Sequence, residues 1–189
     1  MKIAIIGHSG AGKSTLAARL GQLYRLPVLH LDRVFWREGW VQREHEQTLE
    51  MVQAFLDEHR QSGWVIDGTY GKLHFDRRMA EADLILFLDF APLACLQRVT
   101  ARYWQYAGRT RPDLADGCPE KLDAEFLRWV LYKGRAPQKL ERFRLVQRWY
   151  PHKLVTLRSQ RQIDRFTAVA ERAAAARGEG RQAAEKPEK

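Results

Sequence analysis

The sequence predicts an α/β fold in which a parallel sheet is covered by helices on both faces. Three observations carry this prediction. Short apolar runs alternate with longer segments of helical periodicity, several of the apolar runs end at a glycine or an aspartate, and the 189 residues suffice for one domain with a buried core. We expect a single domain over residues 1–177 and a flexible charged tail over 178–189.

The expected elements follow the hydrophobic pattern. Five short apolar runs predict strands over residues 2–6, 28–31, 64–66, 84–88 and 154–157. Apolar residues at helical spacing, with a proline suited to a first helical turn at Pro92, predict helices over about 13–23, 43–60, 92–107, 123–133, 137–149 and 162–177. The segment 108–122 is rich in Gly, Pro and Asp and lacks periodicity, which is typical of a lid.

Polar or glycine residues stand at the ends of four predicted strands: Gly7, Asp32, Asp67 and Asp89. In open parallel sheets, ligands bind beyond the carboxyl ends of the strands. This coincidence predicts a functional site at one edge of the sheet.

The first strand is followed by Gly-His-Ser-Gly-Ala-Gly-Lys-Ser, a full match to the phosphate-binding pattern G-x-x-x-x-G-K-[ST], and then by Thr15. Backbone N–H groups of such a loop point inward at a phosphate, and the following helix adds its positive end. We expect Lys13 to reach the β and γ phosphates of ATP and the Ser14 hydroxyl to ligate Mg²⁺. The predicted ATP contacts are Gly7, Ser9, Gly10, Ala11, Gly12, Lys13, Ser14 and Thr15.

The amino-acid composition narrows the class of P-loop protein. The chain contains no asparagine, whereas GTPases normally read guanine with an Asn-Lys-x-Asp motif. Small kinases or an ATP-binding switch therefore remain. We expect a phosphotransferase with Lys13 and Asp67 in its catalytic centre.

A second magnesium ligand is expected at a strand end, where an acid would act through water. Asp67 is favoured because Gly68 permits close approach of a ligand, and Asp89 is the rival. Either acid could instead cap the next helix.

Arginines are predicted to face the transferring phosphoryl group. Arg98 and Arg102 lie four residues apart on one expected helix, so they share a face, and Arg111 follows in the lid. Such a cluster would neutralise charge in the transition state, with Arg102 and Arg111 as catalytic groups. Solvated surface arginines are the alternative.

The formal net charge of +9 indicates an anionic partner. The Arg-rich stretch 135–148 supports a competing hypothesis, a nucleic-acid-associated ATPase that modulates DNA topology or transcription. An ATP-binding protein with negligible turnover is a third possibility. Two scattered cysteines, no signal peptide and no membrane-spanning run predict a cytoplasmic location, and monomer and dimer both stay open.

The chain resembles the small P-loop kinases of the adenylate kinase and shikimate kinase group. More closely, it is similar to bacterial proteins of the topology modulation, or FlaR-like, family over most of residues 1–166. The matching stretches are Leu31-Asp32 with Trp36 and Trp40, the run 64–71, Arg78, and the runs 111–114, 117–120 and 157–159. The resemblance implies a P-loop NTPase fold of three layers, with sheet order 2-3-1-4-5 and a helical lid. It also implies that Arg98 lies near the adenine, Arg102 near the phosphates, and the loop at Arg158 over the base.

The acceptor of kinases of this shape lies between the second and third strands. Asp32 is placed to bind a hydroxyl or act as a general base. Trp36, Trp40 and Tyr70 could form a stacking wall, and Arg78 could clamp an anionic group, although core packing is the alternative for these residues. Adenylate kinases continue from Asp-Gly with Phe-Pro-Arg, and the Thr69-Tyr70-Gly71 found here does not favour AMP as acceptor.

Overall fold

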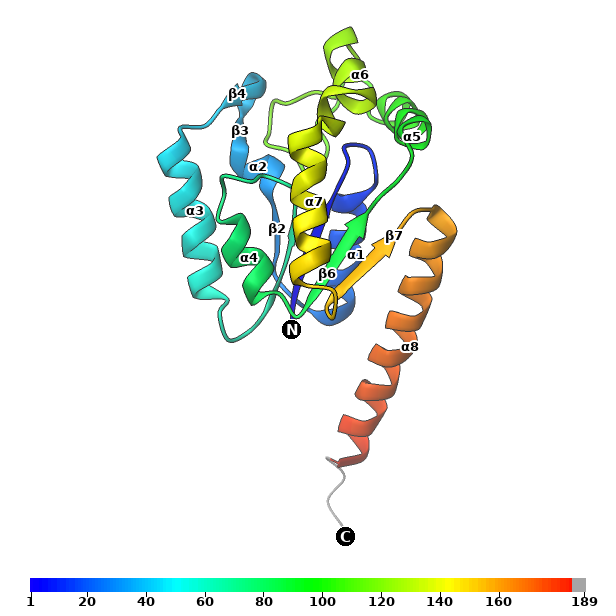
Figure 1. The fold of residues 1–189 in the computed structure, drawn as a ribbon. Helices are drawn as coiled ribbons and strands as arrows, with labels where there is room; N and C mark the ends of the chain where they lie inside the picture. The colour runs from blue at the N-terminus through cyan, green and yellow to red at the C-terminus, as the bar shows by residue number, and fades with distance from the viewer. Residues whose placement is uncertain (185–189) are drawn as a thin grey trace.

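A five-stranded parallel sheet lies at the centre of the computed structural model, which describes residues 1–184 and the side chains of residues 1–176 (Figure 1). Its order is β2-β5-β1-β6-β7, which is 2-3-1-4-5 when only these five strands are counted along the chain. The predicted fold class and strand order are therefore confirmed. The strands are β1 (Lys2–Gly7), β2 (Val28–His30), β5 (Trp64–Asp67), β6 (Leu84–Leu88) and β7 (Leu154–Leu157).

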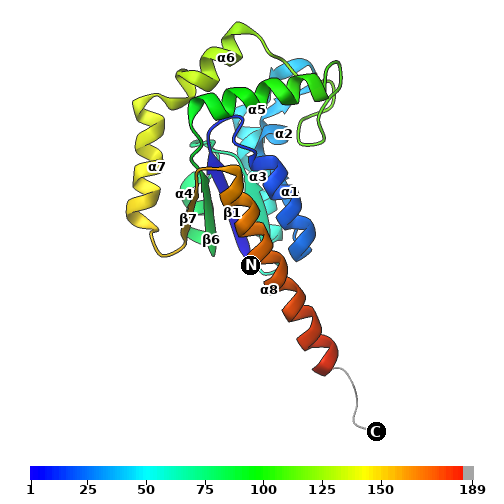
Figure 2. The same ribbon diagram turned by 90° about the vertical axis from the view of Figure 1, so that its right-hand side faces the viewer.

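The central strand β1 explains the three-layer arrangement. Its side chains alternate between the two faces of the sheet, and both sets are buried. Ile3 and Ile5 join a core with the helices on one face, and Ala4 and Ile6 join a second core on the other. Figure 2 shows the sheet between these two groups of helices.

Helices α1 (Lys13–Tyr24), α5 (Pro92–Gln105) and α8 (Gln160–Ala184) contribute to the first core. The second core is completed by α2 (Leu31–Phe35), α3 (His45–Glu58), α4 (Phe75–Glu81) and α7 (Pro137–Trp149). The helix α6 (Ala124–Leu131) packs beside α5. Sequence periodicity located the longer helices to within about two residues at their starts.

Two short elements differ from the sequence prediction. The second strand ends at His30 instead of Leu31, because Leu31 is fully buried in the first turn of α2. The helix α4 was not predicted, since its seven residues are too short for a clear periodic signal.

A small hairpin follows α2 and was also not predicted. It pairs β3 (Trp36–Arg37) with β4 (Val41–Gln42) across the 3₁₀ turn η1 (Glu38–Trp40). Gly39 and Trp40 both have positive φ, at 73° and 63°, so the turn uses a conformation that a tryptophan rarely adopts. The hairpin lies against the lid, where Gly39 N donates to Gly117 O at 3.0 Å.

The C-terminal helix α8 extends to Ala184, beyond the predicted end near residue 177. The side chains of the predicted tail over 178–189 lie outside the described residues. Within the described part of the chain, none of the helices combines the length and apolar character needed to cross a membrane.

Candidate active site

The loop after β1 has the backbone needed to surround a phosphate. Gly10 and Gly12 have φ of 79° and 91°, in the left-handed region that glycine enters without strain. A Cβ on Gly10 would lie 2.6 Å from Val99 Cγ1, and one on Gly12 would lie 2.8 Å from Arg98 Nη1. Gly10 is therefore required by the close approach of α5, including the backbone oxygen of Cys95 at 2.8 Å, as well as by the turn, whereas Gly12 is required by its positive φ.

Lys13 lies at the first residue of α1 and folds back over the loop. Its Nζ donates to the backbone oxygen of His8 at 3.0 Å. Burial lowers the pKa of Lys13, while the carboxylates of Asp32 and Asp67 raise it. The ammonium group is thus held over the phosphate loop, where the charges of both predicted acids act on it.

Ser14, in the first turn of α1, meets Asp67 and His30, which are the last residues of the neighbouring strands β5 and β2. Ser14 Oγ donates to Asp67 Oδ2 at 2.9 Å, and His30 Nδ1 lies 2.5 Å from Asp67 Oδ1. Although burial acts in the opposite direction, the hydrogen bond and charge of Asp67 raise the pKa of His30. The side chains described include no cluster of three or more His, Cys, Asp or Glu that could bind a metal alone. A hydroxyl beside a carboxylate fits Mg²⁺ that takes its other ligands from phosphate and water.

The rival acid Asp89 has different partners. Its Oδ2 lies 3.3 Å from Arg158 Nε, and its Oδ1 lies 3.5 Å from His8 Nε2. The Arg158 side chain is 63% exposed at the start of the loop after β7. Asp89 thus joins that loop to the phosphate loop, whereas Asp67 contacts the Ser14 hydroxyl.

His8 is an unusual residue of the phosphate loop because its imidazole is buried without a hydrogen bond. Neither ring nitrogen has a hydrogen-bond partner, and the ring packs edge-on against Phe143 at 5.3 Å between centroids. The 3.5 Å separation from Asp89 is an ion-pair distance without hydrogen-bond geometry. Burial, followed by the charge of Arg135, lowers the pKa of His8 to about 4.

Acid should therefore destabilise the protein through His8. The unfolded chain binds a proton at this residue near pH 6.5, while the folded chain does so only near pH 4. Stability from this group is complete above pH 6.5 and falls as the pH drops to 4, by about 3 kcal/mol. Urea unfolding of His8→Leu between pH 7 and 4 should lose this part of the pH dependence. The exposed-loop variant His152→Leu should keep it, and equal slopes for the two variants would contradict this account.

A small cavity of about 120 Å³ lies beside the phosphate loop, between α1 and the start of α8. Arg98 lines it together with Gly12, Thr15 and Gln160. Arg98 donates to Ala11 O at 3.1 Å, contacts the Gln160 side chain, and lies 4.4 Å from the centroid of Phe90. The structure thus brings Arg98 next to the loop that was predicted to cover the adenine.

Ser9 is contacted from α6. Its Oγ accepts a hydrogen bond of 3.0 Å from Trp129 Nε1, and the Lys139 ammonium lies 3.3 Å from the centroid of that indole. Sequence analysis did not identify Trp129 as a neighbour of the loop, because 120 residues separate it from Ser9.

The two arginines predicted as catalytic groups, Arg102 on α5 and Arg111 in the lid, are paired by a carboxylate. Arg102 and Arg111 both contact Glu120, and Arg111 Nη1 also donates to Asp113 Oδ2 at 2.8 Å. Glu120 was not predicted as a site residue, because a glutamate in a charged lid gives no sequence signal for burial.

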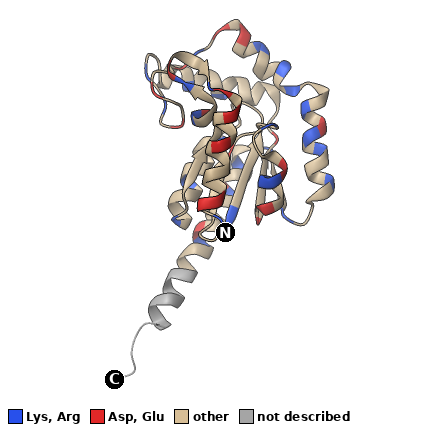
Figure 3. Cartoon of the chain, turned by 90° about the vertical axis from the view of Figure 1, so that its left-hand side faces the viewer, with Lys and Arg blue, Asp and Glu red and all other residues tan. Residues whose placement is uncertain are grey.

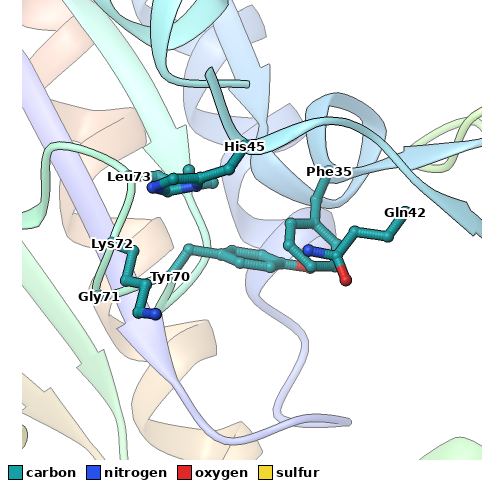
Figure 4. Close-up of a pocket in the computed structure, with 7 residues that line it drawn as sticks. All are labelled: Phe35, Gln42, His45, Tyr70, Gly71, Lys72 and Leu73. Atoms are coloured by element: carbon teal, nitrogen blue, oxygen red, sulfur yellow. The ribbon is translucent and has the colours of Figure 1, made fainter. Parts of the chain in front are cut away.

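On the acceptor side, Asp32 and Tyr70 form one unit. The Tyr70 hydroxyl donates to Asp32 Oδ1 at 2.6 Å, and burial, followed by the Asp32 charge, raises the pKa of Tyr70 well above its ordinary value. The Tyr70 ring also lines an open cavity of about 470 Å³ (Figure 4). Its lining residues are Phe35, Gln42, His45, Tyr70, Gly71, Lys72 and Leu73.

The walls of this cavity differ in part from the sequence prediction. Phe35 and Tyr70 lie 4.7 Å apart between ring centroids, and neither Trp36 nor Trp40 is among the lining residues. The two tryptophans pack edge to face at 5.6 Å, and Trp40 Nε1 donates to Pro119 O in the lid. Of the aromatic side chains expected at the acceptor, Tyr70 lines this cavity, and Phe35 lies beside it in place of the two tryptophans.

Arg78 has a different position from that predicted. Its side chain is fully buried, and its guanidinium donates to the backbone oxygens of Leu73, Gly68 and Tyr70 at 2.9, 3.1 and 2.8 Å. Burial lowers the pKa of Arg78 to about 9, so it remains charged at neutral pH. The prediction that Arg78 clamps the acceptor is wrong, because its donors hold the loop that carries Tyr70.

No family model and no curated protein sequence matches this chain. Among solved structures, the deoxyadenosine kinase of M. mycoides with bound dATP is similar at 16% identity and a TM-score of 0.51, over 89% of this chain and 98% of that chain. The same kinase with the products dCMP and dCDP gives a TM-score of 0.44 at 14% identity, over 89% of this chain and 97% of that one. An uncharacterized protein from Eubacterium ventriosum gives 0.45 at 13% identity, over 90% and 99% of the two chains. The resemblance to the topology modulation family gains no support from these matches. What the first match establishes is the fold, which this chain shares with that deoxyadenosine kinase.

Proposed function

We propose that the chain is an ATP- and Mg²⁺-dependent phosphotransferase of the nucleotide kinase type. The observation that carries the proposal is that residues suited to bind phosphate and residues suited to bind an acceptor meet beyond the carboxyl ends of the strands. Lys13, Ser14 and Asp67 stand on the phosphate side, and Asp32 stands on the acceptor side with Tyr70. The charges of both acids act on Lys13, which supports one continuous site.

The roles follow from the groups present. Bound Mg²⁺ would neutralise phosphate charge, with Ser14 and Asp67 as the residues that hold it. Lys13 orients the terminal phosphates, and the loop glycines present backbone N–H groups to them. Arg98 lines the space for the nucleoside end of ATP, beside the loop at Arg158.

The acceptor side favours a hydroxyl over a phosphate. A phosphate acceptor needs cationic partners, but Arg78 is committed to three backbone oxygens, which leaves Lys72 as the one lysine or arginine among the residues that line the cavity. A hydroxyl acceptor needs a hydrogen-bond acceptor or base, which the Asp32 carboxylate supplies. The aromatic walls Phe35 and Tyr70 suit a flat ring on the same molecule.

The competing nucleic-acid hypothesis loses its main support. The arginines of the stretch 135–148 do not form one exposed stripe, since Arg135 donates to Phe90 O and Arg142 lies over Phe75. Arg144 is paired with Glu141. Figure 3 shows basic and acidic segments interspersed over the elements in view.

An acceptor screen tests the proposal. The protein with Mg·ATP is given nucleosides, beginning with deoxyadenosine, then nucleoside monophosphates and small hydroxylated compounds, and ADP release is measured. We expect ADP release that depends on a hydroxyl acceptor and falls about 10²- to 10⁴-fold in Asp32→Asn. The exposed control Asp76→Asn should retain the wild-type rate.

Three results would contradict parts of the proposal. Transfer to monophosphates alone would exclude the hydroxyl acceptor. An unchanged rate of ADP release in Asp32→Asn would show that Asp32 does not act as the general base. ADP release that ignores small molecules but rises with duplex DNA would replace the kinase with a nucleic-acid-dependent ATPase.

A further inference from the structure

Glu120, near the end of the lid segment, lies between Arg102 of α5 and Arg111 of the lid segment. Its side chain is 3% exposed. Glu120 Oε1 lies 2.6 Å from Arg102 Nη2 and accepts from Arg102 Nε at 2.9 Å, while Oε2 lies 2.6 Å from Arg111 Nε. The contact with Arg111 is an ion pair without hydrogen-bond geometry. Each carboxylate oxygen thus holds one guanidinium.

The two arginines need such a counter-charge. Burial lowers the pKa of Arg102, and the positive charge of Arg111 lowers it further, while Glu120 raises it. Without the carboxylate, two partly buried like charges would repel each other at short range. Glu120 therefore compensates the cost of bringing Arg102 and Arg111 together.

The pair is close to the phosphate side of the site. Arg98, one turn before Arg102 on the same face of α5, donates to Ala11 O of the phosphate loop at 3.1 Å. A Cβ on Gly10 of this loop would lie 2.6 Å from Val99 Cγ1, so α5 packs closely against the loop. Glu120 joins Arg111 to Arg102, so the arginine pair lies at the helix that contacts the phosphate loop.

The position of Glu120 is itself fixed by the acceptor-side hairpin. Trp40 Nε1 donates to Pro119 O at 3.0 Å, and Cys118 Sγ donates to Arg37 O at 3.2 Å. Gly117 also accepts from the hairpin turn, and a Cβ there would lie 2.3 Å from Glu38 Cγ. The residues just before Glu120 are therefore held against the hairpin.

We propose that Glu120 is a positioning residue that holds Arg102 and Arg111 as a pair at the phosphate loop, so that both meet the transferring phosphoryl group together. The inference rests on the proposed kinase function. The proposal predicts different effects on ATP affinity and on turnover. Glu120 is negatively charged, so removing its charge does not weaken the attraction of the site for ATP. Turnover falls because the two arginines are no longer held in the one geometry in which they act together.

The test is Glu120→Gln, assayed in two ways. Calorimetric titration with Mg·ATP should give an affinity at least as high as that of the wild type, while acceptor-dependent turnover falls about 10- to 100-fold. Glu120→Asp should recover part of the turnover. The matched control Glu141→Gln, which breaks an exposed pair with Arg144, should change neither quantity. Unchanged turnover, or turnover and affinity that fall together, would overturn the proposal.

Hydrogen exchange separates this proposal from the kinase assignment, since it needs no substrate. In the ligand-free Glu120→Gln protein, exchange should become faster over residues 108–121 and stay at the wild-type rate in the central sheet. If the wild type shows no kinase activity but this local change appears, the function fails and the positioning role remains. Unchanged exchange in the lid segment, or faster exchange throughout the chain, would overturn the positioning role.

Discussion

Replacement of Lys13 by alanine should lower phosphoryl transfer by about 10²- to 10³-fold, the usual effect of losing one preorganised group that stabilises transition-state charge. Lys13 Nζ is held over the loop by the His8 carbonyl and lies in the field of Asp32 and Asp67. The ammonium is therefore oriented before any ligand binds, and its loss cannot be compensated by a mobile side chain.

The measurement is the rate of ADP release at saturating acceptor, together with the Mg·ATP affinity. Lys133→Ala, which removes an exposed lysine of the 3₁₀ turn η2 (Lys133–Arg135), serves as the charge-matched control and should remain at the wild-type rate. A Lys13→Ala protein that transfers phosphoryl groups within three-fold of the wild type would mean that the reaction occurs away from this loop.

Replacement of Arg78 by methionine should lower the free energy of unfolding by about 3–5 kcal/mol. The change keeps an apolar stem but leaves three backbone oxygens, of Gly68, Tyr70 and Leu73, without their donors. Each buried acceptor that loses its partner costs about 1–3 kcal/mol. The loop over residues 68–73 also carries Tyr70, so the acceptor side should be lost with it.

Urea unfolding measures this effect, and the neighbouring residue offers the control. Arg77 forms partly exposed ion pairs with Asp57 and Glu81, so Arg77→Met should cost no more than about 1 kcal/mol. Similar unfolding midpoints for the two variants would show that the three carbonyl contacts contribute little.

The strands could be predicted from the sequence because continuous apolar runs indicate burial on both faces, and the glycine or aspartate after four of the runs indicates where those strands end. Strands such as Leu84–Leu88 are apolar on both faces, and that pattern needs no tertiary information. The phosphate loop was equally predictable, since its glycines are required by local backbone geometry. In contrast, the hairpin turn at Trp40 depends on contact with Pro119, which is 79 residues away.

The acceptor side was harder to predict because the identity of a side chain does not reveal which groups its hydrogen-bond donors contact. Arg78 suggested an anion site, but its buried guanidinium donates to three backbone oxygens. Phe35 and Gln42 gave no signal, since only the fold of α2 and the hairpin brings them to the cavity beside Tyr70. Glu120 was missed for the same reason, because its partners come from α5 and the lid.

The setting of β1 has a consequence for motion during turnover. This strand pairs with β5 and β6 along both edges and is buried on both faces, so the loop that follows it cannot open without disrupting the sheet. The lid and the hairpin are joined to each other by a few contacts made by Gly39, Trp40 and Cys118. We therefore expect any movement of the segment 108–122 to carry the hairpin with it, while the loop after β1 keeps its position in the sheet.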